Sequence, residues 1–180
     1  MAITYSAGRE ALVHTLFAEV QTGECLVGVL DAARNFDIPN RLKSSNTENY
    51  CLYEGERAEK LWYVAPYVVR CEQKADFVQW LLNEGWGNSW GIFLVAKGLE
   101  EIRDHLRKFL LVKVDGEDDK DFYFRFYDPR VLRTYLPTCT EQERKDFFGK
   151  TRCFLVEGPG GESLLKYSIN DPSVRQEKLV

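Results

Sequence analysis

The stretch Phe-Tyr-Phe-Arg-Phe-Tyr-Asp-Pro-Arg-Val-Leu, residues 122–132, predicts a strand that turns at once into a helix. Its first six residues place phenylalanine at every second position, so we expect a strand over 122–127 with two different faces. Asp128 is a favourable helix N-cap, and Pro129 falls at the first helical position, where a missing N–H costs nothing. The helix that follows is expected to end at Pro137.

The same stretch gathers charge at the edge of the expected sheet. Arg125 leaves the strand, and Arg130 and Arg133 lie on the first turns of the expected helix. Asp31 resembles Asp128, because it also follows an apolar run that reads as a strand. We expect Arg125 to neutralise one of the two aspartates through a two-pronged hydrogen bond, which would make a structural ion pair.

Length and composition favour one folded domain. The chain has 180 residues, enough for a sizeable core and few for two domains. Hydrophobic residues make up 44%, which indicates a folding sequence and not a disordered one. The net charge of -4 argues against a nucleic-acid partner, because such proteins normally carry a basic stripe.

Targeting signals and cysteine usage suggest a cytoplasmic protein. Residues 1–6 lack the basic start and apolar run of a signal peptide. No apolar run approaches the roughly 18–20 residues of a membrane span, so no membrane partner is expected. The cysteines occur singly, without a CxxC pair, and we interpret them as reduced core residues. They are Cys25, Cys51, Cys71, Cys139 and Cys153.

Hydrophobic periodicity gives an alternating order of elements. Helices are expected over 7–20, 32–43, 55–61, 74–83, 99–109, 129–136 and 141–148. Strands are expected over 25–30, 49–53, 66–71, 90–95, 110–114, 122–127, 152–157 and 163–169, with Pro66 at a tolerated first position. Strands alternate with helices early and form hairpins late. This order predicts a single α/β domain, residues 1–169, with a mixed sheet flanked by helices and antiparallel hairpins toward the C-terminus. Residues 170–180 are expected to form a polar tail.

Motifs of catalysis are missing from the sequence. It contains no P-loop, no G-x-G-x-x-G after a strand and no G-x-S-x-G elbow. The glycine-rich run 158–161 is better explained as a hairpin turn than as a phosphate cradle. His14 and His105 are interpreted as solvated helix residues without metal-ligand spacing, although a Cys–His pair formed in space stays a less favoured alternative. We therefore expect no metal, no cofactor and no small-molecule substrate.

Two pairs of residues allow both a structural and a functional interpretation. Asp31 and Asp128 would suit an acid–base pair in a small α/β hydrolase or transferase. Helix capping, worth about 1 kcal/mol for each, is favoured instead. Trp86 and Trp90, framed by glycines, would suit a binding platform, but filling of the core is favoured. The acidic run 115–121 is expected to be a solvated hairpin loop.

Several segments together resemble one bacterial family. In chain order they are Gly28–Ala33, Ala65–Val69, Trp90–Phe93, Leu99–Arg107 and Phe124–Leu132. They are similar to the type VI secretion adaptors, effector chaperones called Tap or TEC and long catalogued as a domain of unknown function. The resemblance runs from about residue 25 to about residue 150 of this sequence. Its most specific part is the strand–Asp-Pro-Arg corner.

The resemblance implies a role without catalysis. Such adaptors bind a toxic effector and the spike protein VgrG in the cytoplasm, and they load the cargo on the spike. Many members continue into a helical C-terminal lobe, whereas this sequence stops soon after its last expected hairpin. We therefore expect partner contacts on the α/β domain itself. They should lie near the charged corner, residues 125–133, or near the loop 86–90, which we call the tryptophan loop. The candidate contact residues are Arg125, Tyr127, Arg130, Arg133, Trp86 and Trp90.

Overall fold

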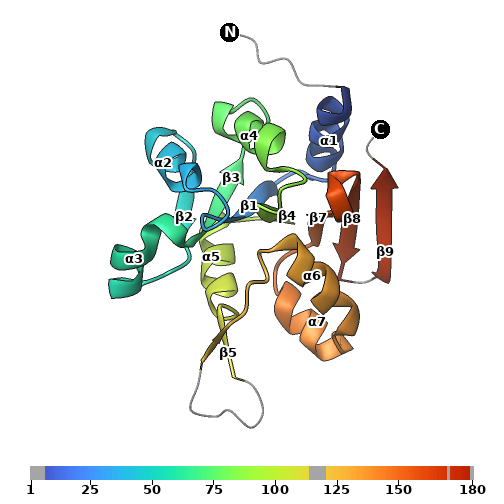
Figure 1. Cartoon of the computed structure of the whole chain (residues 1–180). Coiled ribbons are helices and arrows are strands. Elements are labelled where there is room, and N and C mark those ends of the chain that lie inside the picture. Colours follow the sequence, from blue (N-terminus) through green and yellow to red (C-terminus); the bar gives the residue numbers. More distant parts are fainter. Residues whose placement is uncertain (1–6, 114–120, 170, 179–180) are drawn as a thin grey trace.

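The computed structural model describes residues 7–113, 121–169 and 171–178. Within these ranges one seven-stranded sheet, in the order β2-β3-β1-β4-β7-β8-β9, forms the centre of the molecule (Figure 1). Its strands are β1 (Cys25–Asp31), β2 (Asn49–Cys51), β3 (Pro66–Cys71), β4 (Gly91–Ala96), β7 (Cys153–Glu157), β8 (Ser163–Ser168) and β9 (Asp171–Lys178). A separate two-stranded sheet pairs β5 (Leu111–Val112) with β6 (Phe122–Tyr123).

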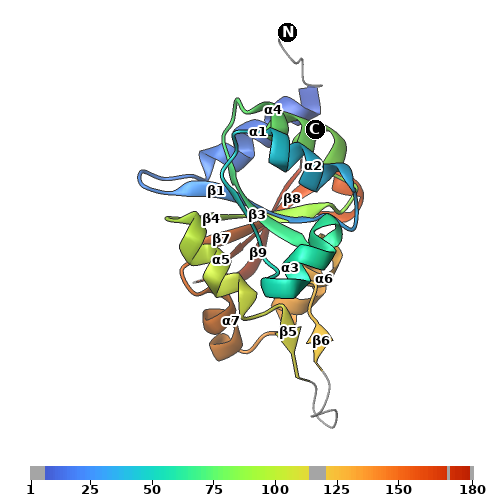
Figure 2. The same cartoon turned by 90° about the vertical axis from the view of Figure 1, so that its left-hand side faces the viewer.

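Helices cover both faces of the large sheet, which confirms the predicted α/β fold class. One face carries α1 (Ala7–Ala18), α2 (Asp37–Ser44) and α4 (Asp76–Trp80). The opposite face carries α5 (Leu99–Arg107), α6 (Pro129–Tyr135) and α7 (Glu141–Phe148) (Figure 2). The short helix α3 (Gly55–Leu61) follows β2, and a π-helical turn, Leu81–Gly85, follows α4.

The interior strand β1 shows why one core lies on each face of the sheet. Every residue of β1 is buried. Leu26 and Leu30 pack into the core under α1, α2 and α4, whereas Val27 and Val29 pack into the core under α5, α6 and α7. Side chains of a strand point alternately to its two faces, so a continuous apolar run feeds both layers at once.

Strand direction differs from our expectation. Every pairing among the described strands is antiparallel, whereas we expected a mixed sheet. The register pairs Asp31 with Pro66, so β3 begins beside the end of β1. The connection between these two strands therefore starts and finishes at the same end of the sheet. A buried apolar run alone does not reveal this, because it is compatible with either direction.

The signature stretch also folds differently from its prediction. Only Phe122 and Tyr123 are in strand β6, and the chain then enters a turn in which the Asp128 N–H donates to the Arg125 carbonyl at 3.0 Å. Phe126 and its neighbour Tyr127 are both buried in the same core, so the alternation does not continue. Burial of two successive aromatic rings requires the turn. The helix start is as predicted, because Asp128 caps α6 and Pro129 is its first residue.

The C-terminal segment is ordered into the sheet. We expected residues 170–180 to form a loose polar tail, but Asp171–Lys178 forms β9 and pairs with β8. Polar composition is typical of tails and also of edge strands, which natural sheets protect with charge. The predicted hairpin of β7 and β8 is confirmed. Most of the predicted acidic loop, residues 115–120, lies outside the described residues.

Candidate functional site

Asp31 and Asp128, the two aspartates singled out in the sequence, lie with Glu157 at one end of the large sheet. At this end β1 finishes with Asp31, whose N–H donates to the Trp90 carbonyl at 2.8 Å just before β4 begins. β7 also finishes here, with Glu157, because it runs antiparallel to β4. Asp128 joins them from the start of α6. We call this region the polar end of the sheet.

Asp128 is satisfied entirely by its own helix start. Its Oδ1 accepts the backbone N–H of Arg130 at 2.9 Å, which is the N-cap hydrogen bond. The Arg130 side chain reaches back, with Nε 3.0 Å from Oδ1 and Nη2 2.5 Å from Oδ2. Burial alone would raise the pKa of Asp128, but these hydrogen bonds outweigh it and lower the pKa. The carboxylate is a structural group with its hydrogen-bonding capacity in use.

Asp31 is buried and only partly satisfied. The residue is 1% exposed, and its Oδ1 accepts the Ala33 N–H at 3.0 Å. Its Oδ2 has no hydrogen-bond partner among the described residues. Burial raises the pKa of Asp31, and the hydrogen bond from Ala33 opposes the rise only in part. The predicted helix cap is therefore wrong: Asp31 caps a turn, because the next helix, α2, begins only at Asp37.

Arg125 does not make the ion pair that the sequence suggested. Its side chain is exposed and forms neither a hydrogen bond nor an ion pair within the described part of the chain. Its charge still acts on Asp31, because burial raises the pKa of that carboxyl and the Arg125 charge opposes part of the rise. Arg130 takes the expected role, because the first turn of α6 places its guanidinium directly over the cap. Arg130 follows the capping residue Asp128 by two positions in the sequence, and this spacing was the signal that could have identified the ion pair.

Glu157 forms a second polar centre that sequence reasoning missed. The residue is 4% exposed, and its carboxylate accepts the Gly87 N–H at 2.6 Å and the Ser89 N–H at 3.0 Å. Gly87 has φ +88°, which glycine adopts without strain. Burial raises the pKa of Glu157, and these hydrogen bonds oppose the rise. A glutamate ending an apolar strand just before glycine was the available signal, but its partners lie about 70 residues away.

Two arginines hold the loop that carries Trp86 and Asn88, and a third holds the end of β7 beside it. Arg133 of α6 donates to the Glu157 carbonyl at 2.5 Å. Arg9 of α1 donates to the Trp86 carbonyl at 3.0 Å, and Arg34 donates to the Asn88 carbonyl at 3.3 Å. These long-range contacts fix the loop against the sheet. Arg133 therefore has a structural role, because it joins α6 to the end of β7.

The tryptophan loop fills the core, as the favoured interpretation held. Trp86 is 5% exposed, and its Nε1 donates to the Gly161 carbonyl at 2.8 Å. Trp90 is half-buried and lies 5.2 Å from the ring of Trp80. Tyr127, another candidate contact residue, is 2% exposed. A partner could reach Trp86 or Tyr127 only after local opening of the fold.

His105 is not the solvated residue that we expected. Its Nε2 lies 2.8 Å from the Phe147 carbonyl, and its ring closes over Gly149, where an added Cβ would clash with it. His14 is exposed, as predicted. The cysteines form no disulfide; Cys25, Cys71 and Cys153 are buried, as expected of core residues, whereas Cys51 and Cys139 are only half-buried. Among the described residues, no group of three or more His, Cys, Asp or Glu side chains could hold a metal ion.

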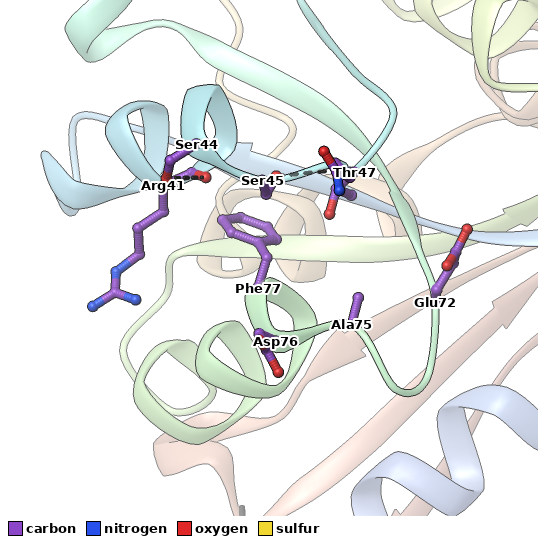
Figure 3. A pocket seen from close by; sticks show the side chains of 9 residues that line it. Arg41, Ser44, Ser45, Thr47, Glu72, Ala75, Asp76 and Phe77 are labelled. Atoms are coloured by element: carbon purple, nitrogen blue, oxygen red, sulfur yellow. Dashed lines mark hydrogen bonds between the residues drawn. The ribbon is translucent and has the colours of Figure 1, made fainter. Parts of the chain in front are cut away.

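A separate cavity of about 420 Å³ lies between the end of α2 and the start of α4 (Figure 3). Its hydroxyl groups serve local turns: Ser44 Oγ donates to the Arg41 carbonyl at 3.1 Å, and Ser45 Oγ accepts the Thr47 N–H at 3.3 Å. The charged side chains Arg41 and Asp76 are exposed at its rim. With its polar groups engaged or solvated, this cavity lacks the convergent polar groups of a ligand site.

The fold and the polar end of the sheet define a helix-covered antiparallel α/β domain in which Arg130 satisfies the helix cap of Asp128. The chain belongs to the family described as a domain of unknown function, DUF4123, whose model matches residues 28–146. The match begins in β1, ends in α7 and includes the corner at Asp128. This family is associated with type VI secretion adaptors.

Comparison with curated proteins gives no match, and comparison with solved structures gives none either. Within the part of the chain that the structure describes, no helix is long and apolar enough to cross a membrane.

Proposed function

We propose that this chain is a cytoplasmic type VI secretion adaptor. It binds a cognate secreted effector and the C-terminal part of a VgrG spike, and it brings the cargo to the spike without catalysing a reaction. The observation that carries the proposal is the family match over residues 28–146, because that family is associated with type VI secretion adaptors.

The geometry of the polar end of the sheet suits a binding role. Asp128 and Glu157 use their oxygens to hold α6 and the tryptophan loop in place. Three arginines, Arg34, Arg125 and Arg130, remain exposed around them. A rigid surface with charged groups at its rim favours specific and reversible association, which an adaptor that must release its cargo requires.

The enzyme alternative, a small hydrolase or transferase using Asp31 and Asp128, has less support. General acid–base catalysis requires both carboxyl groups to come within hydrogen-bond reach of a substrate. Asp31 is 1% exposed, and Arg130 engages both oxygens of Asp128. Burial raises the pKa of Asp31, which is a feature typical of catalytic groups.

A binding experiment with purified proteins tests the proposal. The chain is mixed with the effector encoded beside its gene and with the C-terminal part of the neighbouring VgrG, and size-exclusion chromatography with light scattering follows. We expect a stable complex with the effector and a ternary complex with the spike fragment. An effector that elutes separately from this chain at micromolar concentration, with both proteins folded, would contradict the proposal.

A further inference from the structure

The hairpin of β5 and β6 carries exposed aromatic residues. It extends from the side of the molecule that bears α3 and α5 and points away from the large sheet (Figure 2). Phe122 is 38% exposed and Tyr123 is 46% exposed, and they are neighbours in β6. Successive side chains of a strand point to opposite faces, so these two rings do not form one patch. Exposed aromatic side chains are nevertheless typical of interfaces.

Arg57 of α3 lies over the rings beside this hairpin. Its guanidinium carbon is 5.3 Å from the ring centre of Tyr123 and 6.0 Å from that of Tyr53. The two tyrosine rings are themselves 6.0 Å apart. Stacking on a ring uses the face of a guanidinium group and leaves its N–H edge free. Arg57 forms no ion pair among the described residues, so this edge faces solvent.

A cavity of about 390 Å³ opens between α3 and the hairpin. It is lined by Leu52, Tyr53, Glu54, Glu56, Arg57, Arg107, Leu110 and Leu111. Both glutamates are already paired, Glu54 with Arg107 and Glu56 with Lys60 at 2.5 Å. Arg107 is already engaged in the wall of the cavity, because it donates to the carbonyls of Cys51 and Leu52 and pairs with Glu54 at 2.8 Å. The apolar part of the lining can bury a large side chain, while Arg57 remains available at the mouth.

Arg125 adds a second available positive charge on this side. It is exposed and has no ion-pair partner among the described residues. It follows Tyr123 by two residues, so the chain itself keeps its charge near the Tyr123 ring. Two unpaired arginines therefore flank an aromatic surface on a chain of net charge -4. Electrostatic complementarity selects an acidic partner at such a place.

We propose that Tyr53, Arg57, Tyr123 and Arg125, which we call the arginine–tyrosine groove, bind a protein segment that carries a large apolar side chain beside an aspartate or glutamate. The apolar side chain enters the cavity, and the carboxylate pairs with the edge of Arg57 or Arg125. The inference deepens the proposed function, on which it rests, by stating the chemistry of the segment that the adaptor recognises.

Selection from a random peptide library displayed on phage, with the full chain immobilised, tests the groove. We expect enriched peptides to place leucine, phenylalanine or another large apolar residue next to aspartate or glutamate. Arg57→Glu and Tyr123→Ser should each weaken binding of a selected synthetic peptide by about tenfold or more, since anchor residues carry most of the binding energy of an interface. Thermal unfolding of both variants confirms that they remain folded.

Matched controls are available on the opposite face of the sheet. Arg41 also lies over an aromatic ring, 4.3 Å from the ring centre of Trp80, and Phe36 is 62% exposed. Arg41→Glu and Phe36→Ser should leave peptide affinity unchanged. The proposal is overturned if no peptide is enriched, if enriched peptides lack acidic residues, or if Arg57→Glu binds them as tightly as the wild type. Binding of anionic lipid vesicles with the same dependence on Arg57 would also overturn it.

The effector itself separates the two proposals. If the wild type binds the neighbouring effector and the Arg57→Glu and Tyr123→Ser variants bind it equally well, the groove is not the cargo site and the adaptor function stands. If the wild type does not bind that effector but selects acidic–apolar peptides through Arg57, the groove stands and the proposed function fails.

Discussion

Arg130 closes on Asp128 from two residues further along the chain, with Nη2 2.5 Å from Oδ2 and Nε 3.0 Å from Oδ1. The same aspartate accepts the Arg130 backbone N–H, so one residue satisfies its cap from both sides. The most distinctive motif in the sequence is therefore a self-contained helix start. It orients α6 without help from Arg125, which is left free at the surface.

Loss of the cap should destabilise the fold moderately. We expect Asp128→Ala to lower the free energy of unfolding by about 1–2 kcal/mol, because α6 loses its N-cap acceptor. Arg130→Ala should cost less than about 1 kcal/mol, since the Arg130 side chain is 55% exposed and water screens the pair. Urea unfolding measures both values. An Asp128→Ala protein of unchanged stability that no longer binds its partner would show instead that Asp128 is a contact residue.

Asp31 should make stability depend on pH in a specific direction. Burial raises its pKa above the ordinary value of 3.8, so the folded state holds this proton more tightly than the unfolded state. The stabilisation of the folded state by protonated Asp31 is fully present below pH 3.8, the ordinary pKa. It is lost as the pH rises through the raised pKa of the folded state. Asp31→Asn does not ionise. The unfolding free energy of the variant minus that of the wild type should therefore increase between pH 4 and pH 7.

Urea unfolding of both proteins across this pH range checks the expectation. Glu157, whose pKa is also raised by burial, is present in both proteins, so its contribution cancels in the difference. A difference that stays constant or shrinks with rising pH would show that Asp31 is not held in a raised-pKa state.

Glu157 should hold the tryptophan loop in place. In Glu157→Gln, one of the two backbone N–H groups, of Gly87 or Ser89, faces an amide NH₂ in place of a carboxylate oxygen. A buried donor without an acceptor costs about 1–3 kcal/mol. Hydrogen exchange should accelerate at Gly87 and Ser89. Glu84→Gln, an exposed change in the turn just before the loop, is the matched control and should leave exchange there unaltered.

The aromatic core under α7 should be the most sensitive part of the fold. Phe147 is fully buried, and its ring lies 5.1 Å from Phe109 and 5.2 Å from Phe154. Phe147→Ala should lower the free energy of unfolding by about 3–5 kcal/mol through lost burial and the cavity left behind. Phe122→Ala, at an exposed position, should change it by less than about 0.5 kcal/mol. Similar losses for the two variants in urea unfolding would contradict this account of the core.

The sequence predicted correctly those helices and strands whose bounds depend on interactions between residues close together in the chain. The strand Pro66–Cys71 and the helix Gly55–Leu61 lie within the predicted bounds. The predicted helix 141–148 forms as α7 and begins with a capping box of Thr140 and Glu143, whose two hydrogen bonds lie within one turn. Capping, proline placement and helical periodicity act over a few residues, so they can be read without knowledge of the fold.

Features that depend on distant partners were not predicted. The antiparallel pairing of β1 with β3 depends on the path of the long connection between them. No pattern within either strand encodes this direction. The role of Glu157 depends on Gly87 and Ser89, far away in the sequence. The exposure of Tyr123 follows from where the hairpin lies relative to α3. A charged corner was visible in the sequence, but which arginine is paired and which is free depends on side-chain geometry.

The central claim is that this chain carries one effector to the secretion spike. Deletion of its gene, followed by quantitative mass spectrometry of secreted proteins, tests that claim most directly. We expect the cognate effector to disappear from the medium while the other secreted components of the machine remain at wild-type levels, and a plasmid copy of the gene to restore export. Export of that effector at normal levels from the deletion strain would contradict the assignment.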